Sequence, residues 1–114
     1  MSVRPLACAV AALALTGCSG GGGATVDVTS TEDACRVSTT QLESGKTTLR
    51  IRNDGTRVTE VYVYRNGTEV VTEKENIGPG TTAKMSVTLA TGAYDIACKP
   101  GMEGDGIRTA ITVR

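Results

Sequence analysis

GAYDIACKPGMEGDGIRTAITV, residues 92–113, consists of two alternating segments joined by a glycine-rich loop. Residues 93–98 and 107–113 each alternate between apolar and polar side chains, which is the period of a half-buried β-strand. The loop begins directly after Cys98 and contains Met102. The stretch therefore predicts the last two strands of a β-domain, with a thiol at the end of one strand and a thioether in the loop that follows.

The rest of the chain from residue 25 onward continues this pattern. It is rich in threonine and valine, and turn residues recur at short intervals, which is typical of an all-β sandwich. Asn66-Gly67 predicts a tight hairpin, because both residues tolerate positive φ. We expect strands at 25–30, 34–40, 46–53, 58–65, 68–73, 82–89, 93–98 and 107–113.

The predicted core is aliphatic, since the chain contains no Phe and no Trp. Residues two apart on a strand share a face. In the strand 58–65, Val61 and Val63 occupy one face, whereas Glu60 and two tyrosines occupy the other, so the pattern alone leaves its core face open. The expected core residues are Leu49, Ile51, Val61, Val63, Met85, Val87, Leu89, Ile96, Ile107, Ile111 and Val113.

Charge and composition exclude several functions. The chain has 12 Lys and Arg against 12 Asp and Glu, which argues against nucleic acid, because phosphate binding needs clustered cations. It contains no histidine, so imidazole-dependent nucleophilic pairs and imidazole-ligated zinc are excluded. We therefore expect a binding protein rather than an enzyme.

The N-terminus resembles a bacterial lipoprotein signal. Arg4 precedes an apolar run at residues 6–15, which is too short to span a bilayer as a permanent helix. The run ends in Leu15-Thr16-Gly17-Cys18, which is similar to a lipobox, and a plain secretory signal is the alternative. We expect a signal peptide at 1–17 and a diacylated Cys18.

This organisation implies a tethered domain. Residues 18–24 comprise the lipidated cysteine and a flexible Gly-rich tether, and residues 25–114 form one β-domain. The lipid anchor would hold this domain on the extracytoplasmic side of the cell membrane. Cys35 and Cys98 are then the remaining cysteines, and an exported domain permits them to form a disulfide. Strand parity directs both sulfurs toward the interior.

The short predicted strands, with Cys98 at the end of the penultimate strand and Met102 before the last strand, resemble those of the cupredoxins. The resemblance implies a cupredoxin-like Greek-key β-sandwich of about seven or eight strands. Blue copper proteins hold their metal with two imidazoles, a thiolate and a weak axial methionine. A blue-copper site is excluded here on ligand chemistry, because the chain has no histidine, but Met102 remains available as a soft ligand.

Five segments carry a closer resemblance: ENIGPG at 75–80, CKPGM at 98–102, DAC at 33–35, TEVY at 59–62 and AYD at 93–95. Together they resemble the N-terminal cupredoxin-like domain of the EfeO family, extracytoplasmic components of bacterial iron-uptake systems. The resemblance covers essentially all of residues 25–114. It implies a site for copper or ferric iron formed by Cys35, Glu60 and Cys98. EfeO proteins usually continue into a helical, peptidase-like domain, which we expect here as a partner instead.

Two functions follow as hypotheses. In the first, the lipoprotein binds an iron or copper ion through Cys35, Glu60, Cys98 and Met102, for uptake, redox conditioning or hand-off to a membrane transporter. In the second, a disulfide joins the two cysteines and the β-sandwich is a non-catalytic interaction module at the cell surface. Cysteine Cα atoms within about 7 Å can form a disulfide, whereas convergence of Glu60 on the sulfurs would favour the metal.

Overall fold

The computed structural model describes residues 23–114. The predicted signal peptide and Cys18 lie outside this range, so the lipid anchor stays a prediction. Within the described range, no helix is long and apolar enough to cross a membrane.

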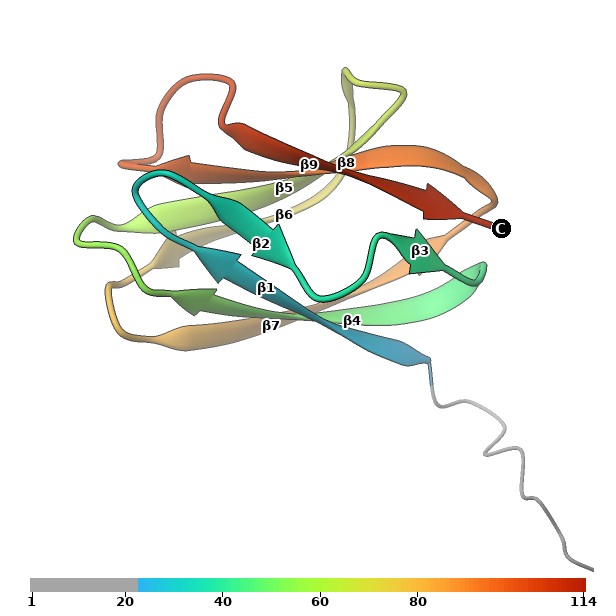
Figure 1. Cartoon of the computed structure of the whole chain (residues 1–114), viewed down its shortest axis with the longest axis horizontal. Coiled ribbons are helices and arrows are strands. Elements are labelled where there is room, and N and C mark those ends of the chain that lie inside the picture. The colour runs from blue at the N-terminus through green and yellow to red at the C-terminus, as the bar shows by residue number, and fades with distance from the viewer. Residues whose placement is uncertain (1–22) are drawn as a thin grey trace, which may run out of the picture.

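Nine strands make up the described part of the chain (Figure 1). Two of them, at 82–89 and 107–113, have the predicted bounds. The strands are β1 (Ala24–Ser30), β2 (Cys35–Val37), β3 (Gln41–Leu42), β4 (Gly45–Asn53), β5 (Thr59–Arg65), β6 (Glu69–Ile77), β7 (Thr82–Leu89), β8 (Gly92–Pro100) and β9 (Ile107–Val113).

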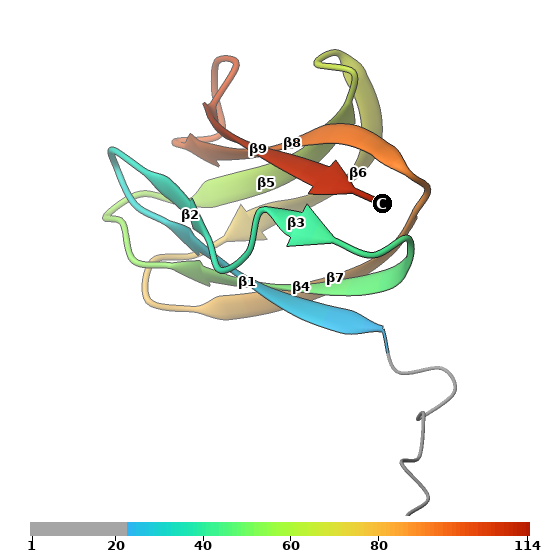
Figure 2. The same cartoon turned by 45° about the vertical axis from the view of Figure 1, so that its right-hand side comes forward.

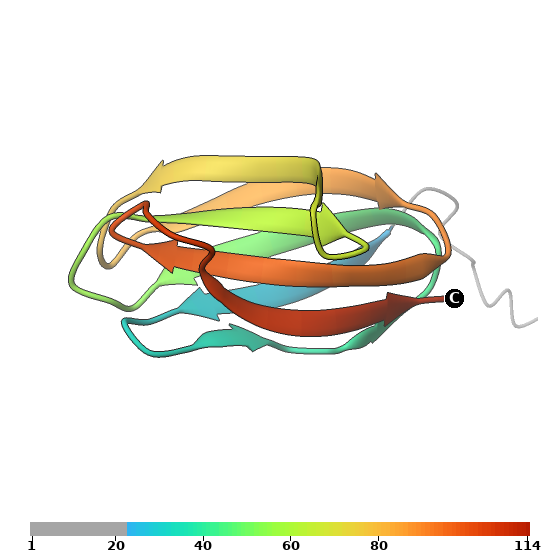
Figure 3. The ribbon, with the colours of Figure 1, turned by 90° about the horizontal axis from the view of Figure 1, so that it is seen from above.

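The strands form two sheets that pack face to face (Figures 2 and 3). One sheet has four strands in the order β2-β1-β4-β7, and the other has five in the order β3-β9-β8-β5-β6. β1 and β4 are parallel neighbours, and β5, β8 and β9 pair antiparallel. The predicted all-β sandwich is confirmed, with one or two strands more than expected.

The chain changes sheets where a single strand, 34–40, was predicted. β2 ends at Val37 and pairs with β1, whereas β3 pairs with β9 in the other sheet. Between them, the Ser38 hydroxyl accepts a hydrogen bond from the backbone N–H of Asp27, and the Thr39 hydroxyl donates to the Gln41 carbonyl. Such side-chain bonds compete with a regular ladder, so the predicted strand is wrong in its extent.

β6 continues well beyond the predicted end at residue 73. Its pairing with β5 contains a β-bulge opposite the segment between Thr59 and Val61, where β6 has one residue more than β5. Asn76 lies at this point with φ of 57°, a left-handed conformation that asparagine tolerates. The extra residue turns the following Ile77 toward the core, where it is buried.

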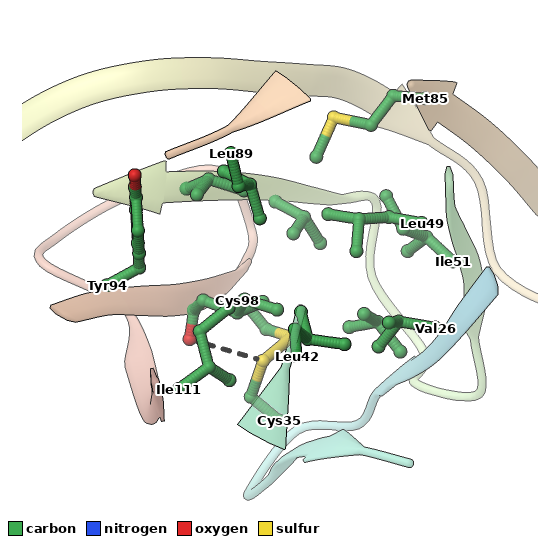
Figure 4. Packing of buried hydrophobic residues seen from close by; sticks show 14 of the residues in the cluster. Val26, Cys35, Leu42, Leu49, Ile51, Met85, Leu89, Tyr94, Cys98 and Ile111 are labelled. Carbon is green, nitrogen blue, oxygen red and sulfur yellow. Dashed lines mark hydrogen bonds between the residues drawn. A yellow bond between two sulfur atoms is a disulfide. The ribbon is translucent and has the colours of Figure 1, made fainter. Parts of the chain in front are cut away.

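The core lies between the two sheets and is largely aliphatic (Figure 4). Val61 and Val63 are fully buried in it, which resolves the open question for β5 and places Glu60 on the outer face. Val87 and Ile107, predicted as core, are only partly buried against it. Members of the buried core cluster that were not in the list of predicted core residues are Val26, Val28, Cys35, Leu42, Ile77, Tyr94 and Cys98.

A network around Glu32 joins two loops at one end of the sandwich. One carboxylate oxygen of Glu32 accepts hydrogen bonds from the backbone N–H groups of Thr56 and Arg57 at 2.8 and 3.2 Å, and from the Thr56 hydroxyl at 2.9 Å. The other oxygen accepts from the Arg57 guanidinium at 2.9 Å. These bonds, led by the backbone bond from Thr56, lower the pKa of Glu32 from 4.5 to about 2.

We expect Glu32→Gln to destabilise the domain at neutral pH and to have no effect in strong acid. Because the folded-state pKa is lowered, the carboxylate stabilises the fold above its unfolded pKa, and this contribution is lost as the pH falls toward about 2. Urea unfolding of both proteins between about pH 2 and pH 7 measures the difference. Asp33→Asn, a neighbouring charge removal, is the control. A pH-independent difference between wild type and Glu32→Gln would contradict the prediction.

Candidate metal centre

Cys35 and Cys98 form a disulfide that connects the two sheets. Their sulfur atoms are 2.08 Å apart and their Cα atoms 5.4 Å apart, and both side chains are buried (Figure 4). Cys35 Sγ also lies 3.8 Å from the carbonyl oxygen of Ile96. The predicted disulfide pairing is therefore confirmed, and in this state neither sulfur is a thiolate that could bind a metal.

The structure does not bring the four predicted ligands together. Cys98 pairs with Val61 across β5 and β8, and both side chains point into the core. Glu60 directly precedes Val61 on β5, so its side chain points to the opposite face of the sheet. Met102 is half-buried in the turn after β8, where its N–H donates to the Lys99 carbonyl. No single site contains these residues.

Glu60 instead joins two glutamates of β6. Carboxylate oxygens of Glu60, Glu73 and Glu75 all lie within 4.8 Å of one another. β5 and β6 are antiparallel neighbours, and the register pairs Glu73 with Tyr62, two residues after Glu60. The three residues, called the acidic cluster below, therefore lie on the outer face of the five-stranded sheet, away from the disulfide.

Glu60 differs from its two neighbours in its burial. Its side chain is 7% exposed, whereas Glu73 and Glu75 are exposed. Within residues 23–114, no hydrogen bond or ion pair involves its carboxylate. Lys99 pairs with Glu60 across the strands, but its ammonium group donates to the Tyr64 hydroxyl at 2.7 Å. Burial of an unpaired carboxylate is costly, but Thr47 Oγ1 is the only fully buried side-chain polar atom without a partner in residues 23–114, so the Glu60 carboxylate retains some contact with solvent.

The electrostatics of the cluster are those of crowded negative charge. The carboxylate of Glu73, followed by burial and the charge of Glu60, raises the pKa of Glu75. The neighbouring Glu73 carboxylate, with burial and the charges of Glu60 and Glu75, raises the pKa of Tyr62. A nearby negative charge disfavours ionisation of an acidic group. A bound cation would remove this repulsion.

The three glutamates of the acidic cluster offer oxygen donors to a metal ion. Carboxylates suit hard cations, whereas cuprous ions prefer sulfur. A blue-copper centre does not fit this chain, because it has no imidazole and the one candidate thiolate, Cys98, is in a disulfide. The arrangement suits a hard metal ion at the surface of the sheet.

Glu73 and Glu75 were missed by sequence reasoning. They stand two residues apart in VVTEKENI, which places them on one face of a strand. The signal was therefore present, but the predicted strand ended at residue 73. The Asn66-Gly67 hairpin predicted the pairing of β6 with β5, but their position beside Glu60 depends on the register of that pairing, which contains bulges that the sequence pattern did not specify.

Two solved structures share the fold of this chain. The reduced auracyanin of Roseiflexus castenholzii matches with a TM-score of 0.62 and 16% identity, covering 82% of this chain and 99% of that chain. An azurin of Methylomonas sp. strain J matches with a TM-score of 0.60 and 14% identity, over 82% of this chain and 99% of that one. At such low identity these likenesses establish the cupredoxin fold alone.

Sequence relatives are iron uptake proteins. The chain is 38% identical over 73 residues to the iron uptake system component EfeO of Escherichia coli K12, and the same holds for EfeO of Shigella flexneri. The match covers 64% of this chain but only 19% of each relative. A family model for the cupredoxin-like domain matches residues 6–113. The chain therefore belongs to the cupredoxin-like domain family and is related to the EfeO iron uptake component.

Proposed function

We propose that this domain binds iron at the acidic cluster and serves in iron capture and hand-off on the extracytoplasmic side of the cell membrane. The observation that carries the proposal is Glu60, a residue only 7% exposed, whose carboxylate has no hydrogen bond or ion pair among the described residues and lies within 4.8 Å of those of Glu73 and Glu75. Buried charges in proteins are normally paired or coordinate metals. An iron ion would supply the partner that Glu60 lacks.

The choice of iron rests on two kinds of support. The EfeO relatives are named as iron uptake components, and the cluster consists of carboxylates, which match a hard ion such as ferric iron. The disulfide between Cys35 and Cys98 removes the sulfur ligands that would favour cuprous copper. Cupric copper remains an outcome that a comparative titration can detect.

The proposal also includes a lipid anchor at the cell membrane and a partner protein there. A diacylated Cys18 would anchor the domain to the outer leaflet, and the tether at 18–24 would give it local freedom. Partners would be a membrane iron transporter or a peptidase-like uptake component. The acidic cluster lies on an outer sheet face with two of its three carboxylates exposed, so bound iron would be open to exchange with such a partner.

We expect Glu60→Gln to weaken ferric binding by at least about tenfold, because two unit charges about 4 Å apart interact by about 4 kcal/mol at an effective dielectric constant of about 20. The change keeps the size of the side chain and removes one of three charges. Equilibrium dialysis of the disulfide-bonded protein against ferric citrate, with metal analysis, measures the affinity. Parallel dialysis against cupric ions tests the metal preference.

Glu69→Gln is the matched control. Glu69 lies on the same strand as Glu73 and Glu75, but it pairs with Arg65 at the other end of the hairpin. The control should bind iron as well as the wild type. Absence of iron binding by the wild type, or equal binding by Glu60→Gln, would contradict the proposed function.

A second function is favoured by the disulfide itself. A β-sandwich whose sheets are cross-linked, with its thiols consumed, is also suited to a non-catalytic interaction module at the cell surface. This function requires no metal. The same dialysis separates the two, because a pure interaction module would retain neither iron nor copper.

A further inference from the structure

The outer face of the four-stranded sheet is rich in basic side chains. Along its strands, the residues that alternate with the buried core positions point outward, to solvent. Asp27 is the one acidic residue among these outward positions, and Asp54 directly follows β4. The basic ones, called the basic face below, are the exposed residues Arg36, Lys46, Arg50, Arg52 and Lys84.

Strand pairing brings the cations of the basic face together. Arg50 and Lys84 are register partners across β4 and β7. Arg36 and Arg52 are the two register partners of Thr29 on β1. The whole chain has equal numbers of acidic and basic residues, but the fold separates part of them. The basic face and the acidic cluster lie on the opposite outer faces of the sandwich (Figure 2).

The basic face has hydrogen-bond donors that the described residues do not use. A hollow of about 400 Å³ lies in this face and is lined in part by Arg50 and Arg52. Each of these guanidiniums binds an aspartate through Nε, Arg50 to Asp27 and Arg52 to Asp54. Within residues 23–114, their terminal nitrogens have no hydrogen bond, and the other cations of the basic face have no ion pair. Guanidinium groups match the geometry of phosphate oxygens, so this face suits a phosphate-bearing partner.

We infer that the basic face binds the anionic phospholipid headgroups of the membrane to which the domain is anchored. This inference rests on the lipid anchor of the proposed function and adds to it the orientation of the domain. Residues 19–23 separate Cys18 from Ala24, the first residue of β1. Such a segment spans at most about 20 Å. The anchor would therefore keep a strand of the four-stranded sheet within reach of the headgroups.

The separation of charge selects one orientation of the anchored domain. A basic residue near an anionic surface gains about a fivefold preference for it, whereas a carboxylate is repelled. The acidic cluster is on the outer face of the five-stranded sheet. Binding through the basic face therefore points the acidic cluster away from the membrane. Iron held there would stay open to a partner protein.

Amine footprinting of the lipid-anchored protein on preformed vesicles tests this orientation. A membrane-impermeant acetylating reagent is applied on phosphatidylglycerol vesicles and on phosphatidylcholine vesicles, and mass spectrometry measures the reaction rate at each lysine. Lys46 and Lys84 belong to the basic face, whereas Lys74 is exposed on β6 of the other sheet. We expect the rates at Lys46 and Lys84, each divided by that at Lys74, to be at least about fivefold lower on the anionic vesicles. About 1 M salt should remove the difference.

Two variants separate the basic face from net charge. Arg36→Gln/Lys84→Gln should abolish the slowing at Lys46. Arg65→Gln/Arg114→Gln removes the same charge from the five-stranded sheet side and should keep the slowing.

Each outcome decides the inference. Rate ratios that are equal on the two kinds of vesicle, or slowing that is lost equally in both variants, overturn it. The proposed iron binding then stands, because dialysis measures it without vesicles. Equal slowing by inorganic phosphate alone would identify a site for small anions and also overturn the inference. A protein that stays with neither kind of vesicle would overturn the anchor and the orientation together.

Discussion

Replacing both cysteines of the disulfide with alanine is expected to destabilise the domain by about 4 kcal/mol, or about 20 °C in Tm. Cys35 and Cys98 are separated by 63 residues, so the cross-link closes a large loop and restricts the conformations of the unfolded chain. The bond also joins β2 of one sheet to β8 of the other. Urea unfolding of the wild type and the Cys35→Ala/Cys98→Ala variant measures the difference.

Reduction of the wild type provides the control. A reductant should lower wild-type stability toward that of the double variant and leave the variant unchanged. If oxidised and reduced wild type unfold within about 1 kcal/mol of each other, the entropic estimate fails. The folded double variant also separates the two metal sites considered above. It should bind iron like the reduced wild type if the acidic cluster is the site, and more weakly than the reduced wild type if the Cys35 or Cys98 thiolate is a ligand.

The disulfide and the orientation of its strands could be predicted from the sequence. Alternation in residues 93–98 placed Cys98 on the same face as Ile96, and both are buried. The alternation placed Cys98 correctly because a strand has a period of two and its apolar side chains identify the face that packs in the core. The same rule shows why Glu60 does not reach the sulfurs: it is one residue from Val61, the partner of Cys98.

The acidic cluster could not be predicted in the same way. The hairpin at Asn66-Gly67 was predicted, but the cluster depends on the extent of β6 and on its register against β5, and the alternation of a single strand contains neither. β6 is an edge strand whose exposed residues lack a hydrophobic pattern. Its bulge at Asn76 further shifts the period, so that Ile77 is buried although the simple alternation of β6 places it outside. The register of the β5–β6 hairpin, with its bulge, assembled this site.

Asn53 is the last residue of β4, and its side chain forms hydrogen bonds at the end of the sandwich where β6 also ends. Its side chain is 1% exposed. The amide nitrogen donates to the carbonyls of Arg57 and Ile77 at 2.7 and 2.8 Å, and the amide oxygen accepts from the Gly55 N–H at 2.9 Å. One side chain thus closes the turn after β4 and ties it to the last residue of β6.

We expect Asn53→Ala to destabilise the domain by about 3 kcal/mol, because each buried polar group left unpaired costs about 1–3 kcal/mol. The variant leaves the carbonyl of Ile77 and the N–H of Gly55 without partners. Asn53→Asp keeps the shape and the acceptor but directs a carboxylate at two carbonyl oxygens. It should be destabilised at neutral pH and partly restored in acid, since a protonated carboxyl group donates one hydrogen bond. Urea unfolding at about pH 4 and pH 7 measures both variants. A stability of Asn53→Asp that does not rise on acidification relative to wild type would show that Asn53 does not act through the donation seen here.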